Sequence, residues 1–215
     1  MSHTLIAAAA GAVLALAAWP FTRHVVTLVH EGGHALVAVL TGRRLSGIRL
    51  HRDTSGLTTS IGRPHGPGMI ATAAAGYLAP SALGLGGAWL VSLGHTAWAL
   101  WIGLAVLAAM LLFIRNWFGL LVVLLAGAAV ATLIWRSSTD VQELAALSFS
   151  WLLLVGGPRA SVELWITRSR SRSRTSDADV LARLTRVPAA VWNIVFVLAT
   201  LAALWPAARL AGLVG

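Results

Sequence analysis

The sequence lacks cysteine and lysine and has few charged residues of any kind. Charged residues make up 11% of its 215 residues, whereas a soluble globular domain carries about 25%. A soluble protein of this size could not cover its surface with so few charges, and the hydrophobic share of 58% excludes intrinsic disorder. Without cysteine, the chain has no disulfide, no thiolate metal site and no cysteine nucleophile. An integral membrane protein is the class that remains.

The apolar stretches predict an all-α polytopic membrane protein with about six to seven transmembrane helices, since one span takes about 20 residues. We expect the residues 1–215 to form a single membrane-embedded domain. In chain order, the expected spans cover residues 5–19, 25–40, 69–93, 97–114, 117–135, 144–167 and 188–210.

The polar segment after the second expected helix has the pattern of a small β-hairpin. Residues 45–52 and 57–61 are short strand-like runs, and the turn-forming sequence Asp-Thr-Ser-Gly at 53–56 separates them. Asp favours turns for conformational reasons, so Asp53 needs no chemical role. We therefore expect a two-stranded hairpin at the membrane surface.

All of the basic residues are arginine, and most fall in loops that the alternation of spans assigns to one side of the membrane. The positive-inside rule places that side, and with it the amino terminus, in the cytoplasm. The alternation of Arg and Ser over residues 168–174 is typical of a solvated linker that contacts anionic lipid. We expect the lipid bilayer, and not nucleic acid, as the partner of these charges.

Three ionisable side chains lie within five residues of the second expected span, in the sequence His-Glu-Gly-Gly-His at 30–34. Such a side chain at membrane depth costs roughly a few kcal/mol or more, so it needs a compensating partner. His30 and His34 are four residues apart, so both imidazoles project from one helix face and can bind one Zn²⁺. Glu31 is the next residue, close enough to touch a metal-bound water. This is the H-E-x-x-H arrangement of zinc hydrolases.

Gly32 and Gly33 are unfavourable neighbours within a helix, by about 1 kcal/mol each relative to alanine. Two explanations stay open for them. Either another helix or an extended substrate approaches the backbone closely at this point, or the glycines serve ordinary small-residue helix packing.

A catalytic zinc ion needs a third protein ligand and an open position for water. Four of the other acids have different expected places or roles: Asp53 in the turn, Asp140 and Glu143 on the outer side, and Glu163 paired with Arg159 four residues before it. Asp177 and Asp179 are left. Ser176 and Asp179 fit a capping box, which gives Asp179 a structural role. Asp177 is therefore the favoured third ligand, and Asp179 is the alternative.

Together these residues resemble the site-2 protease family of membrane-embedded zinc metallopeptidases. Residues 30–34 match the family's zinc-binding helix. Residues 75–81, Ala-Gly-Tyr-Leu-Ala-Pro-Ser, are similar to the next helix in the compact bacterial branch of the family. Residues 176–188 are similar to that branch's carboxyl-terminal segment, where an Asp completes the metal site.

The resemblance implies a zinc-dependent intramembrane endopeptidase of the bacterial plasma membrane. It would hydrolyse peptide bonds of membrane-spanning protein substrates, as in regulated intramembrane proteolysis. His30, His34 and Asp177 would hold Zn²⁺, with Glu31 as general base. The hairpin could pair with an unwound substrate strand by β-addition. The polar candidates for stabilising the oxyanion are His65 and Asn193.

A second class of function stays open. The chain could be a non-catalytic polytopic membrane protein, such as a transporter, a scaffold or an inactive relative of the protease. Its two histidines would then bind metal without catalysis, or pack as hydrogen-bonded core residues.

Overall fold

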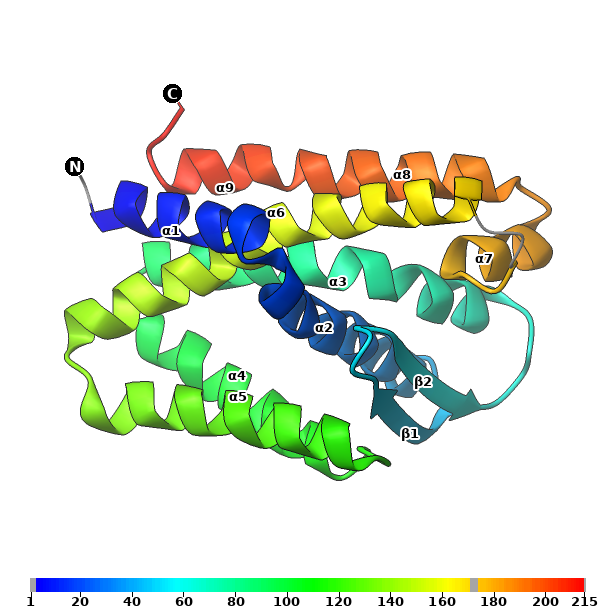
Figure 1. The fold of residues 1–215 in the computed structure, drawn as a ribbon, viewed down its shortest axis with the longest axis horizontal. Helices are drawn as coiled ribbons and strands as arrows, with labels where there is room; N and C mark the ends of the chain where they lie inside the picture. Colours follow the sequence, from blue (N-terminus) through cyan, green and yellow to red (C-terminus); the bar gives the residue numbers. More distant parts are fainter. Residues whose placement is uncertain (1–2, 171–173, 215) are drawn as a thin grey trace.

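The computed structural model describes residues 3–170 and 174–214, so residues 171–173 of the Arg–Ser run lie outside the described ranges. Nine helices and one two-stranded sheet make up the described chain (Figure 1). The helices are α1 (His3–Ala17), α2 (Trp19–Leu40), α3 (Pro67–Ser92), α4 (Thr96–Leu111), α5 (Trp117–Arg136), α6 (Thr139–Arg170), α7 (Asp177–Thr185), α8 (Ala189–Ala202) and α9 (Leu204–Leu210). The strands are β1 (Arg44–Leu50) and β2 (Gly56–Ile61).

The expected fold class is confirmed, since the chain is a helical membrane protein with a small hairpin after its second helix. Within the described residues, four helical stretches are long and apolar enough to cross a membrane: α3, α5, α6 and the stretch of α8 and α9. The pair of α1 and α2 adds a fifth if it is one broken span, bent by 102°. The number is below the expected six to seven, because the first two apolar runs form this bent unit and α4 has only 16 residues.

Pro20 and Arg159 account for the bend between α1 and α2. Pro20, in the first turn of α2, has no N–H with which to continue the hydrogen-bond ladder of α1. The Arg159 guanidinium, from α6, donates instead to the carbonyls of Ala15 and Leu16, at 2.9 and 2.7 Å. It also lies over the ring of Trp19, 4.7 Å from its centroid. The carbonyls that the bend leaves without helical donors are thus satisfied by a neighbouring helix.

The expected pair between Arg159 and Glu163 is wrong. Glu163 lies 3.5 Å from the Arg23 guanidinium on α2, and Trp19 Nε1–H donates to it at 3.3 Å. A pair four residues apart on a helix gains only about 0.2–0.5 kcal/mol. Arg159 therefore points to the carbonyls at the end of α1, and Glu163 points to Arg23 on α2.

Glycines let the helices around α6 approach it closely. α6 continues as one helix through Gly156, Gly157 and Pro158. A Cβ added to Gly84 of α3 would lie 2.6 Å from the carbonyl oxygen of Ser150 on α6. Close backbone contact of this kind supplies the van der Waals packing that holds membrane helices together.

The predicted hairpin is present and lies beside α2 (Figure 1). β1 and β2 are antiparallel, with Ile48 opposite Thr58. On its other edge β1 contacts the chain before α5: the Ile48 N–H donates to the Phe113 carbonyl at 2.8 Å, and the Ile48 carbonyl accepts from the Arg115 N–H at 2.9 Å. In the sheet that the structure describes, β1 is therefore bonded along both edges, and β2 pairs along one.

Asp53 has the turn role that the sequence predicts. Its Oδ1 accepts from the backbone N–H and the hydroxyl of Ser55, at 3.0 and 2.7 Å. These hydrogen bonds lower the pKa of this exposed carboxyl. The next residue, Thr54, adopts a φ of 69°, as is usual only in tight turns.

Gly84→Ala tests the packing of α3 on α6. Its new methyl group would meet backbone, which cannot turn aside as a side chain can, so the free energy of unfolding should fall by about 1–3 kcal/mol. Gly86→Ala is the matched control, because a Cβ there meets nothing within 4 Å. Thermal unfolding in detergent compares the two variants, and equal melting temperatures would contradict this account of the packing.

Candidate metal centre

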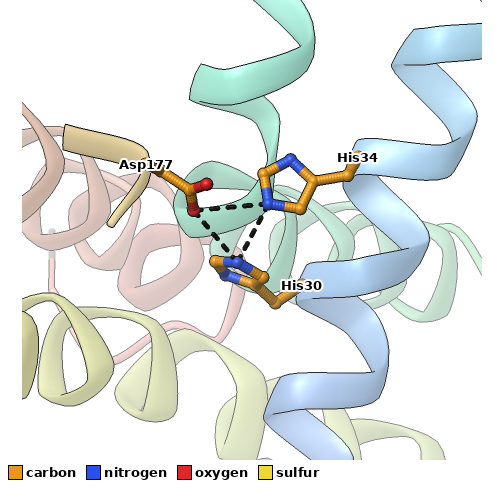
Figure 2. A group of neighbouring side chains, drawn as sticks. All are labelled: His30, His34 and Asp177. Carbon is orange, nitrogen blue, oxygen red and sulfur yellow. Dashed lines mark hydrogen bonds and ion pairs between the residues drawn. The ribbon is translucent and has the colours of Figure 1, made fainter. Parts of the chain in front are cut away.

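His30, His34 and Asp177 come together although more than 140 positions separate the histidines from the aspartate in the sequence. His30 Nε2 and His34 Nε2 are 3.0 Å apart, and Asp177 Oδ2 lies 3.2 Å from the first and 3.3 Å from the second. Figure 2 shows the three donor atoms converging on one point between α2 and α7. Of the residues that the structure describes, these three form a group that could hold a metal ion.

Helix geometry explains the position of each donor. The histidines are four residues apart on α2 and so lie one above the other on one face. Asp177 is the first residue of α7, which starts with a capping box: Ser176 Oγ accepts from the Asp179 N–H, and Asp179 Oδ2 accepts from the Ser176 N–H. This box fixes where the helix begins and therefore where Asp177 stands.

Asp179 lies outside the group and has the structural role that the capping box predicts. Its buried carboxylate accepts from Arg168 of α6 at 2.6 Å and from the Ser176 hydroxyl at 2.6 Å. Burial raises the pKa of Asp179, but the hydrogen bonds from Arg168 and Ser176 and the arginine charge outweigh it and hold the pKa below its ordinary value. The Arg168–Asp179 pair thus fastens the start of α7 to the end of α6.

The three donors fit a zinc ion in both chemistry and spacing. Two imidazole nitrogens and one carboxylate oxygen are common ligands of Zn²⁺, and bonds of about 2.0–2.1 Å in a tetrahedron place ligand atoms about 3.3–3.4 Å apart. The separations here are 3.0–3.3 Å. His34 Nδ1–H donates to the Thr72 carbonyl of α3 at 2.7 Å, which leaves the Nε2 lone pair free for a metal.

Glycines on α2 and α3 make room for the histidines. A Cβ added to Gly76 of α3 would overlap His34 Nε2 and lie 2.6 Å from the His30 ring. A Cβ at Gly33 of α2 would overlap the Ala79 side chain of α3. Close approach of α3 therefore explains Gly33, whereas a Cβ at Gly32 would make ordinary contacts only.

Glu31 is buried beside the group, with its carboxylate against the hairpin. The Thr58 hydroxyl lies 2.6 Å from Glu31 Oε2, at hydrogen-bond distance, and a Cβ added to Gly56 would overlap Oε1. The residues that enclose the site, Gly56, Thr58 and Thr72 among them, carry no sequence signal for this role. Gly76 does lie within the motif at 75–81, where the resemblance gave it no individual function.

The group opens onto a cavity of about 490 Å³ that is lined by the hairpin, α2, α3, α6 and α7. Tyr77 also lines it, with its ring edge-on to His30 at 4.7 Å between centroids. Of the polar candidates for the oxyanion, His65 is exposed in the loop before α3, and Asn193 lines a different cavity beside Arg168. Neither lies in the lining of the cavity that holds the three donors.

The fold and the donor group together define a helical membrane protein with a group of side chains that could hold a metal ion. A family model described as Peptidase M50B-like matches residues 3–207, nearly the whole chain. The chain belongs to this family, which confirms the resemblance to the site-2 proteases. No curated protein and no solved structure was found to match it.

Gly76→Ala tests how closely α3 confines the two histidines. The added methyl group would displace their Nε2 atoms, so we expect bound zinc to fall, with the affinity lowered by about 10- to 100-fold. Gly86→Ala, on the same helix, is the control. Zinc per protein is measured by elemental analysis after dialysis against a zinc buffer. Wild-type zinc content in Gly76→Ala would show that the histidines do not depend on this space.

Proposed function

We propose that the protein is a zinc-dependent intramembrane endopeptidase that cleaves membrane-spanning protein substrates. The observation that carries the proposal is the joint placement of three metal-binding donors and a buried glutamate in one cavity among apolar helices. Family membership supports a peptidase, and the long apolar helices support action at membrane depth. The resemblance to the compact bacterial branch favours a bacterial plasma membrane, and the positive-inside rule favours its cytoplasmic side for the Arg-rich loops around the hairpin and α7.

In this proposal each side chain has a defined task. His30, His34 and Asp177 hold the zinc ion, which when bound polarises the scissile carbonyl and makes water a better nucleophile. Glu31 accepts a proton from the attacking water at its carboxylate and later delivers it to the leaving amine. His34 keeps its proton on Nδ1, which donates a hydrogen bond to the Thr72 carbonyl.

The hairpin provides a route for binding substrate. A transmembrane helix uses its own backbone groups for hydrogen bonding, so a substrate segment must unwind before its peptide bonds can be attacked. Strand β2 lines the cavity, and an extended segment could add to its unpaired edge. Backbone pairing of this kind recognises an extended segment with little demand on its side chains.

Glu31→Gln separates catalysis from metal binding. Glutamine keeps the shape of the side chain but cannot accept the proton, so cleavage of a purified single-span reporter should fall by about 10²- to 10⁴-fold. Zinc content should match that of the wild type, because Glu31 is not one of the three donors. Absence of cleavage by both proteins would favour the non-catalytic alternative, and undetectable zinc as well would mean that the histidines only pack. Equal cleavage by both would show that Glu31 is not the general base.

Replacing Asp177 and Asp179 separately identifies the third ligand. Asp177→Asn removes the charge that meets both imidazoles, so bound zinc and cleavage should both be lost. Asp179→Asn should keep its zinc but melt at a lower temperature, because Arg168 loses its ionised partner. Elemental analysis and thermal unfolding are run on both variants. Zinc loss only in Asp179→Asn would reverse the assignment.

A further inference from the structure

The carboxylate of Glu31 is held by a strand and not by a neighbouring helix. The Thr58 hydroxyl lies 2.6 Å from Glu31 Oε2 and 3.1 Å from the Glu31 carbonyl oxygen. Gly56 is two residues earlier on β2, and the absence of a side chain there leaves room for the carboxylate. Side chains alternate along a strand, so Gly56 and Thr58 share the face of β2 that meets α2. The intervening Leu57 is exposed on the other face.

The backbone of Thr58 points to the unpaired edge of β2. Ile48, its partner on β1, uses its own N–H and carbonyl for the segment before α5. Ile48 and Thr58 are therefore a non-hydrogen-bonded pair of the antiparallel ladder: they lie opposite each other, but their backbone groups do not bond to each other. The N–H and carbonyl of Thr58 therefore point away from β1, along the edge that an added strand would use. Thr58 also lines the cavity of the metal centre.

One residue thus contacts the proposed base through its side chain and presents its backbone to the position of a bound strand. We propose that Thr58 is a positioning residue for Glu31, whose hydroxyl fixes the carboxylate relative to the edge of β2. A substrate peptide bond held along that edge then has a fixed position relative to the Glu31 carboxylate, which accepts the proton. This inference rests on the proposed function and adds a role for the hairpin in the reaction itself, beyond binding.

The effect of losing this hydrogen bond differs from that of losing a ligand or a fold contact. Without the donor, the Glu31 carboxylate can rotate away from the substrate, while the three metal-binding donors stay where they are. Turnover should therefore fall while zinc content and substrate binding stay unchanged. Methyl in place of hydroxyl preserves the shape of the side chain, so Thr58→Val is the suitable change, and Thr58→Ser restores the donor.

The experiment compares Thr58→Val, Thr58→Ser and Thr59→Val in the full-length protein, with a purified single-span reporter. Thr59→Val is the matched control, since its hydroxyl donates to the Gly47 carbonyl and lies on the opposite face of β2. We expect kcat of Thr58→Val to fall by about 10- to 100-fold, with KM and zinc content unchanged. Thr58→Ser should recover most of the loss, and Thr59→Val should behave as the wild type.

Three results would overturn the inference: unchanged kcat in Thr58→Val, an equal loss in Thr58→Ser, or loss of zinc from Thr58→Val. In each of these the wild type still cleaves, so the proposed function stands. A wild type that binds zinc but never cleaves would overturn both. If Thr58→Val does not fold, Gly56→Ala tests the same contact from its other side, because its methyl group would push against Glu31 Oε1. A folded, zinc-loaded Gly56→Ala with wild-type kcat would count against the inference.

Discussion

Ionisable side chains on an apolar helix must find partners, and much of this fold supplies them to α2. His34 reaches Asp177 on α7 through one ring nitrogen and the Thr72 carbonyl on α3 through the other. Glu31 reaches Thr58 on β2. The partners come from three elements: β2 and α3, which follow α2 closely in the sequence, and α7, which comes much later. α2 can therefore be buried at low cost only when α3, α7 and the hairpin have all come together around it.

The two histidines of the donor group and Glu31 each lie against a glycine of a neighbouring element. Gly76 leaves space for the two imidazoles, and Gly56 leaves space for the glutamate. Gly33 lets α3 come near enough for its carbonyl to accept from a histidine on α2. Here the lack of a side chain matters more than backbone freedom, because none of the three has a positive φ. At each of these contacts, the space that the glycine leaves is filled by the facing side chain or helix, as close packing requires.

Local sequence signals account for what could be predicted, and tertiary contacts account for the rest. Hydrophobic runs, a turn sequence and a capping box are local, and they predicted the fold class, the hairpin and the role of Asp179. The spacing of His30 and His34 is also local. The place of Thr58 depends on which strand lies over α2, and no residue pattern records that. Arg159 shows the same limit, since a bend elsewhere in the chain offered its guanidinium stronger partners than the carboxylate one turn away.

The position of Asp177 resolves an electrostatic difficulty that a donor within a span would face. A carboxylate deep in an apolar helix with no hydrogen-bond donor or cation beside it would take up a proton. Asp177 instead begins a short helix outside the spans, where the helix dipole favours a negative charge. Burial raises its pKa, but the facing histidines outweigh that effect and keep the pKa below its ordinary value. Because Arg168 and Asp179 fix this helix to α6, the Asp177 carboxylate is held in place beside the two histidines.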